Sequence, residues 1–205
     1  MSEEVRRMDN EITKLCEGCK ITDEEIQEVV VAEGNMLMSA ERVRKCLVAR
    51  IMSDKEVNKG AFCATMSKLW HAERQIFLRD IGWNRFLVEF QKKKDKNSVL
   101  QGRPWPFDKF LVCLQECDGN VALRDIQFSM EPFWIQFHNM PFVGMTRKIG
   151  EQLGVTIGRV LVMDTNESGT GWRKFLRVKI LVDISKPLAR GRFLNLGDKR
   201  FFYYY

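Results

Sequence analysis

The 205-residue sequence predicts an α+β fold that consists of two tandem ferredoxin-like units, each with the order βαββαβ and an antiparallel sheet. Three observations predict it. Short alternating apolar runs are bounded by turn residues, helical patterns lie between them, and the whole order recurs after roughly 85 to 90 residues. An apolar share of 45% is ample for a core. We call the two units the first repeat (46–117) and the second repeat (132–205).

The first repeat begins with a buried strand over 46–51. Asn58 is placed to cap a helix whose apolar positions Phe62, Met66 and Leu69 recur at four and three residues. The remaining elements follow in order: strands over 76–81 and 86–90 joined by a turn at 82–85, a helix over 92–100 ended by Gly102 and Pro104, and a strand over 109–114.

The strand over 86–90 determines what the first sheet can bind. Phe86, Val88 and Phe90 alternate and should face the helices as core. Arg85 and Leu87 then occupy the open face, where an RNA-recognition motif carries aromatic residues that stack on bases. We therefore expect this sheet to contact nucleic acid through phosphates rather than by that stacking.

Residues 118–131 form a linker, and Leu123, Ile126 and Phe128 should tether it to a surface. The second repeat opens with an alternating strand between Pro132 and Pro141. The later elements are a helix through 145–153 stopped by Gly154, strands over 159–164 and 175–184, a single helical turn over 185–191 and a strand over 199–205.

Residues 1–45 are predicted to form an acidic N-terminal arm or helix, with a capping-box pattern at 22–25. Cys16 and Cys19 have the spacing of half a zinc site. Tetrahedral zinc needs four ligands and no second pair follows at ligand spacing, so we expect neither a metal nor another cofactor.

The net charge of +6 is unevenly distributed: residues 1–46 carry −4, residues 47–132 carry +3 and residues 133–205 carry +7. Concentrated basic charge favours a polyanion partner, although a solvated basic surface has the same signature. No apolar run is long enough for a bilayer span, and the acidic amino terminus is unlike a secretory signal. We expect an intracellular protein of the nucleus or cytoplasm with no membrane partner.

Catalysis is not indicated. His71 and His138 lie far apart in the sequence, and neither has a carboxylate or nucleophile in a catalytic pattern. No phosphate-binding loop, dinucleotide fingerprint or paired-carboxylate motif is present. We therefore expect a protein that is not an enzyme.

The candidate binding residues lie in the second repeat. Arg177 and Lys179 share the outward face of one strand, and Trp134 and His138 project from the neighbouring strand. A basic face with an aromatic group is typical of single-strand binding, whereas a covered face would make Trp134 a packing residue. The expected phosphate contacts are Arg173, Lys174, Arg177, Lys179, Arg190 and Arg192.

Several motifs together resemble a known family: 57–62 (VNKGAF), 66–70 (MSKLW), 86–90 (FLVEF), 99–108 (VLQGRPWPFD), 132–141 (PFWIQFHNMP), 175–178 (FLRV) and 183–188 (DISKPL). They are similar to the plant domain of unknown function found in proteins derived from LINE-type (non-LTR) retrotransposons. In that family a CCHC zinc knuckle usually follows. This chain ends before that position, so no zinc-dependent binding is expected.

The resemblance and the charge together lead to a non-enzymatic protein that binds RNA or single-stranded DNA with low sequence specificity. Two alternatives stay open. One is a protein-interaction module that self-associates or binds a protein partner through its open sheet faces. The other is a decayed retroelement fragment without activity.

Overall fold

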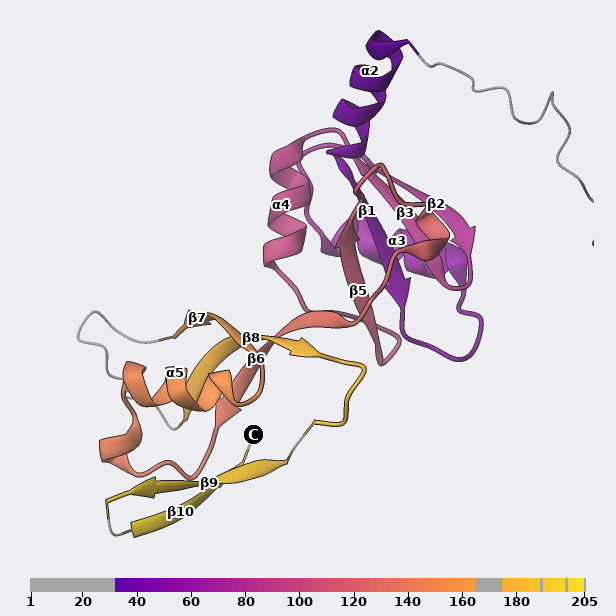
Figure 1. The fold of residues 1–205 in the computed structure, drawn as a ribbon. Helices are drawn as coiled ribbons and strands as arrows, with labels where there is room; N and C mark the ends of the chain where they lie inside the picture. Colours follow the sequence, from indigo (N-terminus) through magenta and orange to yellow (C-terminus); the bar gives the residue numbers. More distant parts are fainter. Residues whose placement is uncertain (1–31, 165–174, 189, 198, 205) are drawn as a thin grey trace, which may run out of the picture. The chain divides into compact units, whose positions relative to one another are not determined.

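The computed structural model describes residues 32–164, 175–188, 190–197 and 199–204 (Figure 1). By the density of its internal contacts the chain divides into an N-terminal part, Met1–Ser39, and a larger part, Ala40–Tyr205, which contains both repeats. Helix α2 (Glu33–Val43) begins in the N-terminal part and ends in the larger part. The capping-box pattern at 22–25 and the Cys16–Cys19 pair lie outside the described residues.

The first repeat has the predicted order βαββαβ. Its sheet is antiparallel throughout, with the strand order β2-β3-β1-β5-β4, so that β1 lies between β3 and β5. Strand β4 is an addition that the sequence did not indicate. The elements are β1 (Cys46–Ile51), α3 (Lys59–Leu69), β2 (Ile76–Gly82), β3 (Arg85–Phe90), α4 (Lys93–Gln101), β4 (Trp105–Phe107) and β5 (Phe110–Glu116).

The core of this sheet lies on its helix side. Phe86, Val88 and Phe90 are buried there as predicted, against Phe62 and Met66 of α3. The Asn58 side chain caps α3 by accepting a hydrogen bond from the Ala61 amide.

One predicted core position of α3 is wrong. Leu69 is 37% exposed, whereas Trp70 is 4% exposed. Trp70 follows Met66 by four residues and Phe62 by eight, so it continues their stripe on the helix surface.

The linker covers part of the opposite, open face of the sheet. Ile126 and Phe128 are buried in a cluster with Val48 of β1 and Cys113 of β5, and Leu123 packs at its margin. The predicted tether is therefore present. A short 3-10 helix, η1 (Leu123–Asp125), interrupts the linker.

The second repeat is built on an antiparallel sheet of order β6-β8-β7, formed by β6 (Met130–Phe137), β7 (Arg159–Met163) and β8 (Leu176–Asp183). A second 3-10 helix, η2 (Phe142–Gly144), precedes helix α5 (Arg147–Val155). The expectation that Gly154 stops the helix is wrong. Gly154 lies inside α5, where its missing side chain lets the helix approach Val160 and Ile180.

The end of the second repeat differs from the prediction. The expected helical turn over 185–191 is replaced by a turn at 184–185, because the Asp183 carboxylate accepts hydrogen bonds from the amide and hydroxyl of Ser185. Strand β9 (Gly191–Leu196) then pairs with β10 (Lys199–Tyr204) as a hairpin. Among the described residues, one bridge between His138 and Tyr204 joins this hairpin to the end of β6.

Candidate nucleic-acid interface

The predicted binding face of the second repeat is formed by β6 and β8. Trp134 lies opposite Lys179 in the strand register, and Gln136 lies opposite Arg177. The Arg177 guanidinium lies over the Trp134 ring, 4.4 Å from its centroid, and the Lys179 ammonium is 5.6 Å from the same centroid. The structure therefore brings Trp134, Arg177 and Lys179 together on one face.

The two cations of this face already have protein partners. The Lys179 ammonium donates a 2.6 Å hydrogen bond to the carbonyl of Gln101, and burial lowers its pKa. The Arg177 Nη1 lies 4.0 Å from the Asp164 carboxylate. Trp134 is half-buried, with a cation on its ring. A ligand at this face would have to displace some of these contacts.

The remaining predicted site residues differ in their placement. His138 lines a cavity of about 350 Å³ together with Trp134 and Gln136, and its ring also stacks on Tyr204 of β10 with ring centroids 5.4 Å apart. Arg192 donates to the Thr156 carbonyl at the end of α5, and α5 packs on the face of the sheet opposite Arg177. Arg190 is exposed, and Arg173 and Lys174 lie outside the described residues.

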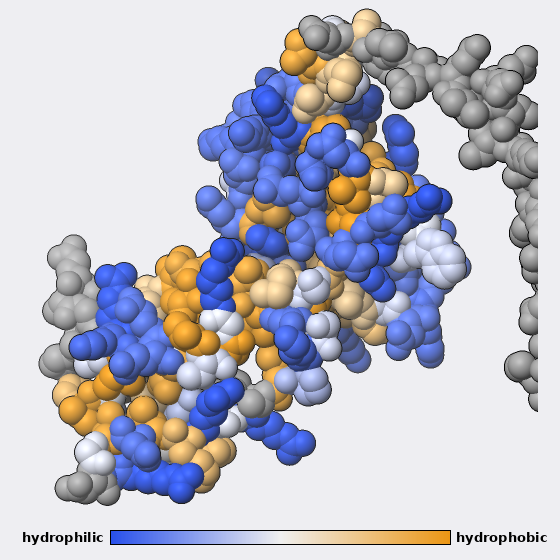
Figure 2. Space-filling model, in the orientation of Figure 1, coloured by the Kyte–Doolittle hydropathy of each residue, from blue (hydrophilic) through white to orange (hydrophobic). Residues whose placement is uncertain are grey.

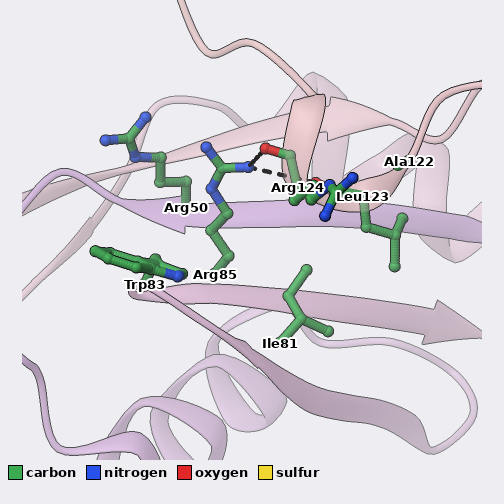
Figure 3. A pocket seen from close by; sticks show the side chains of 7 residues that line it. All are labelled: Arg50, Ile81, Trp83, Arg85, Ala122, Leu123 and Arg124. Carbon is green, nitrogen blue, oxygen red and sulfur yellow. Dashed lines mark hydrogen bonds between the residues drawn. The ribbon is translucent and has the colours of Figure 1, made fainter. Parts of the chain in front are cut away.

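A second basic site lies at one end of the open face of the first sheet. It is a cavity of about 610 Å³, and Figure 3 shows the side chains around it. Its lining residues are Arg50, Ile81, Trp83, Arg85, Ala122, Leu123 and Arg124.

Strand register places two arginines side by side in this cavity. Arg50 of β1 is the direct partner of Arg85 of β3, and both lie on the open face because their strand neighbours Ala49 and Phe86 are in the core. Burial and the Arg50 charge lower the pKa of Arg85. Two like charges are therefore held together, with the Arg50 guanidinium forming no hydrogen bond or ion pair to any described residue.

The linker fixes Arg85 and adds the third arginine. Arg85 donates from Nη1 to the carbonyls of Leu123 and Arg124 in η1 (Figure 3). Its guanidinium also lies 5.5 Å from the centroid of the Phe128 ring. The Arg124 side chain is exposed and lies 3.8 Å from the neighbouring Asp125 carboxylate. Arg85 is thus a fixed part of the wall. Arg50 has no polar side-chain partner among the described residues, and Arg124 is an exposed cation that shares its charge with Asp125.

The turn between β2 and β3 presents Trp83 at the rim. Trp83 and Asn84 both have positive φ angles, 56° and 55°, which is the pattern of a type I′ hairpin turn. A bulky residue rarely adopts this conformation, and Trp83 is 94% exposed. The turn therefore displays an indole that contributes nothing to the core.

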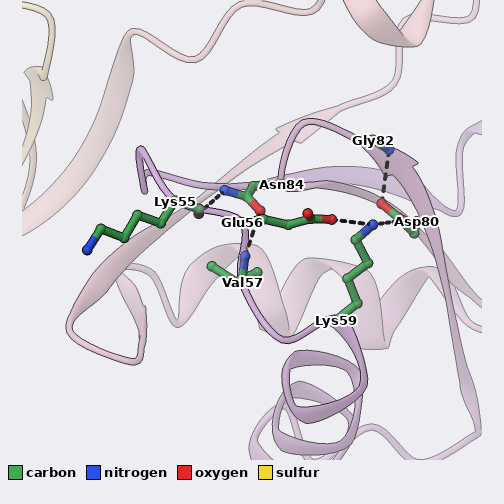
Figure 4. A network of polar contacts seen from close by, with 7 residues as sticks. All are labelled: Lys55, Glu56, Val57, Lys59, Asp80, Gly82 and Asn84. Carbon is green, nitrogen blue, oxygen red and sulfur yellow. Dashed lines mark hydrogen bonds and ion pairs between the residues drawn. The ribbon is translucent and has the colours of Figure 1, made fainter.

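A network of polar contacts holds this turn (Figure 4). The Asn84 side chain donates to the carbonyls of Ser53 and Lys55, and its oxygen accepts from the amide of Val57. The Asp80 carboxylate accepts from the Gly82 amide and pairs with Lys59 at 2.9 Å, which lowers the pKa of Asp80. These contacts fix the backbone on both sides of Trp83.

The sequence indicated the parts of this site but not their assembly. Local patterns predict the turn at 82–85 and place Arg85 on the open face of the sheet. Arg50 lies in a strand that the sequence predicts to be buried, and Arg124 lies in the linker. Both approach Trp83 only because the strands pair and because Ile126 and Phe128 attach the linker to the sheet. An exposed tryptophan in a tight turn was the one available signal.

Within the described part of the chain, no group of three or more His, Cys, Asp or Glu side chains is arranged to hold a metal ion. Likewise, no described helix is long and apolar enough to cross a membrane.

The Cys113 thiol is buried in the first sheet. Burial raises its pKa to about 12, which is typical of a cysteine that packs in a core.

Comparison with known proteins agrees with part of the family resemblance. Residues 39–123 match the family model described as Domain of unknown function (DUF4283). The Arabidopsis thaliana protein named "Uncharacterized protein At4g02000" is 24% identical over 94 residues, which are 46% of this chain and 29% of that protein. Residues 39–123, which contain the first repeat and the start of the linker, are therefore similar to a domain of unknown function, and the chain spans less than a third of the length of the plant relative.

Proposed function

We propose that the protein binds single-stranded nucleic acid, either RNA or single-stranded DNA, without catalysis and with little sequence preference. The observation that carries this proposal is the set of three arginines, Arg50, Arg85 and Arg124, around one cavity beside an exposed indole. Guanidinium groups match phosphate oxygens in geometry and charge, and phosphate contacts release counterions whatever the sequence.

The basic second repeat supports a longer contact. Arg190 and Arg192 are exposed, and residues 133–205 carry a net charge of +7. In this proposal the nucleic-acid strand binds at the cavity, and the positive charge of the second repeat also attracts its phosphates. We further propose that the domain derives from a LINE-type retroelement and acts in the nucleus or cytoplasm; the motifs shared with that family support the origin.

A salt titration tests this function. The affinity of the protein for a fluorescent single-stranded oligonucleotide is measured by anisotropy over a range of salt concentrations. The logarithm of the affinity should fall linearly with the logarithm of the salt concentration, with a slope of about −0.7 for each phosphate contact. Absence of binding at low ionic strength, or a flat response to salt, contradicts the proposal.

Paired variants make the test specific. Arg50→Gln removes one proposed phosphate contact and should reduce the slope by roughly one contact. Arg44→Gln is the matched control, because Arg44 is an exposed arginine that follows α2, pairs with Glu41 at 3.7 Å and lies outside both the cavity lining and the second repeat. It should leave the slope nearly unchanged.

A protein-interaction module is the second candidate function. Phe193 and Phe202 form an exposed aromatic pair on the β9–β10 hairpin, with exposed fractions of 58% and 45%. Figure 2 shows hydrophobic side chains gathered over the second repeat. Size-exclusion chromatography with light scattering distinguishes the two: a stable dimer without affinity for nucleic acid would favour this candidate.

A further inference from the structure

The cavity is an opening beside the linker on the open face of the first sheet, and a further cavity of about 410 Å³, lined in part by Leu87 and Glu89, lies on the same face. Ile126 and Phe128 of the linker pack on Val48 and Cys113 at the middle of the open face. An extended single strand of nucleic acid therefore cannot lie across this sheet from edge to edge. The space left beside Arg50 and Arg85 is about 610 Å³, which falls within the range of pockets that enclose one small ligand.

Trp83 offers a flat surface beside this opening. Its side chain is 94% exposed, and the Asn84 contacts hold the backbone that carries it. A second cavity of about 390 Å³ adjoins the first and shares Arg50 and Trp83 as lining residues. The indole thus stands between two hollows, where a planar group can stack on it.

The charges of the two cavities differ. The larger cavity is lined by three arginines and by no carboxylate. The smaller cavity is lined by Asp54 and Glu56 as well as Arg50 and Lys55. The charges in the lining of the smaller cavity balance, so a phosphate group is attracted more strongly to the larger cavity.

We infer that the larger cavity binds one unpaired nucleotide of the strand, with its base stacked on Trp83 and its phosphate against Arg50 and Arg124. This inference rests on the proposed function and specifies that the protein recognises one unpaired nucleotide at a time in this cavity. Arg85 is a positioning residue here, because the η1 carbonyls hold its guanidinium in the wall.

Selection for single strands follows from this arrangement. A base in a duplex is stacked on both faces, so it cannot lie on Trp83 unless it leaves the helix. The phosphates of a duplex remain available to the arginines. The protein should therefore prefer unpaired nucleotides through Trp83, and attract any strand through Arg50 and Arg124.

The test separates bases from phosphates. Binding of a short oligothymidylate is compared with binding of an abasic oligonucleotide of the same length, which keeps every phosphate but has no base. The wild-type protein should bind the oligothymidylate more tightly by roughly 5- to 150-fold, the range that stacking of one base provides. Trp83→Ala should remove most of that ratio, and Trp83→Phe should retain part of it.

A matched aromatic variant and a folding check complete the design. Phe77→Ala removes another exposed aromatic residue from β2 of the same sheet and should leave the ratio unchanged. Circular dichroism should show that Trp83→Ala folds, since Trp83 is outside the core.

The outcomes distinguish the two proposals. Equal affinity for both oligonucleotides, or a preference that survives Trp83→Ala, overturns the single-nucleotide site while nucleic-acid binding stands. An equal loss of affinity for both oligonucleotides in Trp83→Ala also overturns it, because the indole then acts without the base. If neither oligonucleotide binds at low ionic strength, the proposed function itself fails.

Discussion

Arg50 of β1 and Arg85 of β3 lie directly opposite each other on adjacent antiparallel strands, and both side chains are on the same face of the sheet. Like charges placed directly opposite each other destabilise a sheet. The Arg85 guanidinium is anchored to η1, whereas the Arg50 guanidinium has no such contact among the described residues. Arg50 therefore adds repulsion to the unliganded protein that an anion would relieve.

The first prediction is that Arg50→Gln stabilises the unliganded protein. Loss of the opposed charge should raise the free energy of unfolding by about 0.2–1 kcal/mol, while the affinity for an oligonucleotide falls. Urea unfolding measures the stability of the variant and of the wild type. A lower stability in the variant would show that Arg50 has a structural role that its contacts do not reveal.

The second prediction concerns the Asn84 side chain, which contacts Ser53, Lys55 and Val57. Asn84→Ala leaves these backbone groups without their partner and places an alanine at a φ angle of 55°. It should lower the free energy of unfolding by about 1–3 kcal/mol. Asn84→Gly loses the same hydrogen bonds but tolerates the angle, so it should be the less destabilised of the two. Equal losses in urea unfolding would mean that the angle contributes nothing.

The third prediction is a pH dependence due to Glu131, which is fully buried in β6. Burial raises its pKa from 4.5 to about 7, although Arg103 lies 3.9 Å away and opposes the shift. The folded protein then binds more protons than the unfolded chain between these two pH values, so its stability should fall as the pH rises from about 4.5 to 7.

Glu131→Gln cannot ionise and should remove this component, leaving a melting temperature that is flatter across that range. Glu151→Gln, at an exposed position of α5, is the control and should keep the dependence. Carboxyl groups with lowered pKa values, such as those of Glu73 and Asp183 at about 2, act at lower pH and in the opposite direction. A wild-type protein that becomes more stable toward pH 7 would contradict the prediction.

The fourth prediction tests how α5 packs on the second sheet. A Cβ atom at Gly154 would lie 2.5 Å from Cγ2 of Val160 and 3.3 Å from Cδ1 of Ile180. Gly154→Ala should therefore lower the free energy of unfolding by about 1–3 kcal/mol. Gly60→Ala in α3 is the matched change: its nearest atom is 3.6 Å away, so the variant should be neutral or slightly stabilised in thermal denaturation.

Local patterns predicted those parts of the fold that depend on neighbours in sequence. Alternation identified the core residues Phe86, Val88 and Phe90, and capping chemistry identified Asn58, because both signals lie within a few residues. The end of the second repeat could not be read in this way. The Asp183 carboxylate competes for the Ser185 backbone, and the strand that follows pairs with a hairpin partner instead of the sheet.

The candidate site was partly predictable for a similar reason. The sequence placed Trp134, Arg177 and Lys179 on one face, and the structure agrees with that placement. It could not show that Lys179 reaches Gln101, which is 78 residues away. The cavity beside Trp83 also depends on contacts between distant segments.

The linker sets a boundary for any shortened version of this protein. A fragment that ends at residue 117 keeps every strand of the first sheet, yet it loses the η1 carbonyls that hold Arg85 and the Phe128 ring beside it. A fragment that ends at residue 123, where the family match ends, still lacks Arg124. A fragment made to study the first repeat should therefore extend beyond Phe128, because a shorter fragment keeps the strands of the sheet but lacks part of the cavity lining.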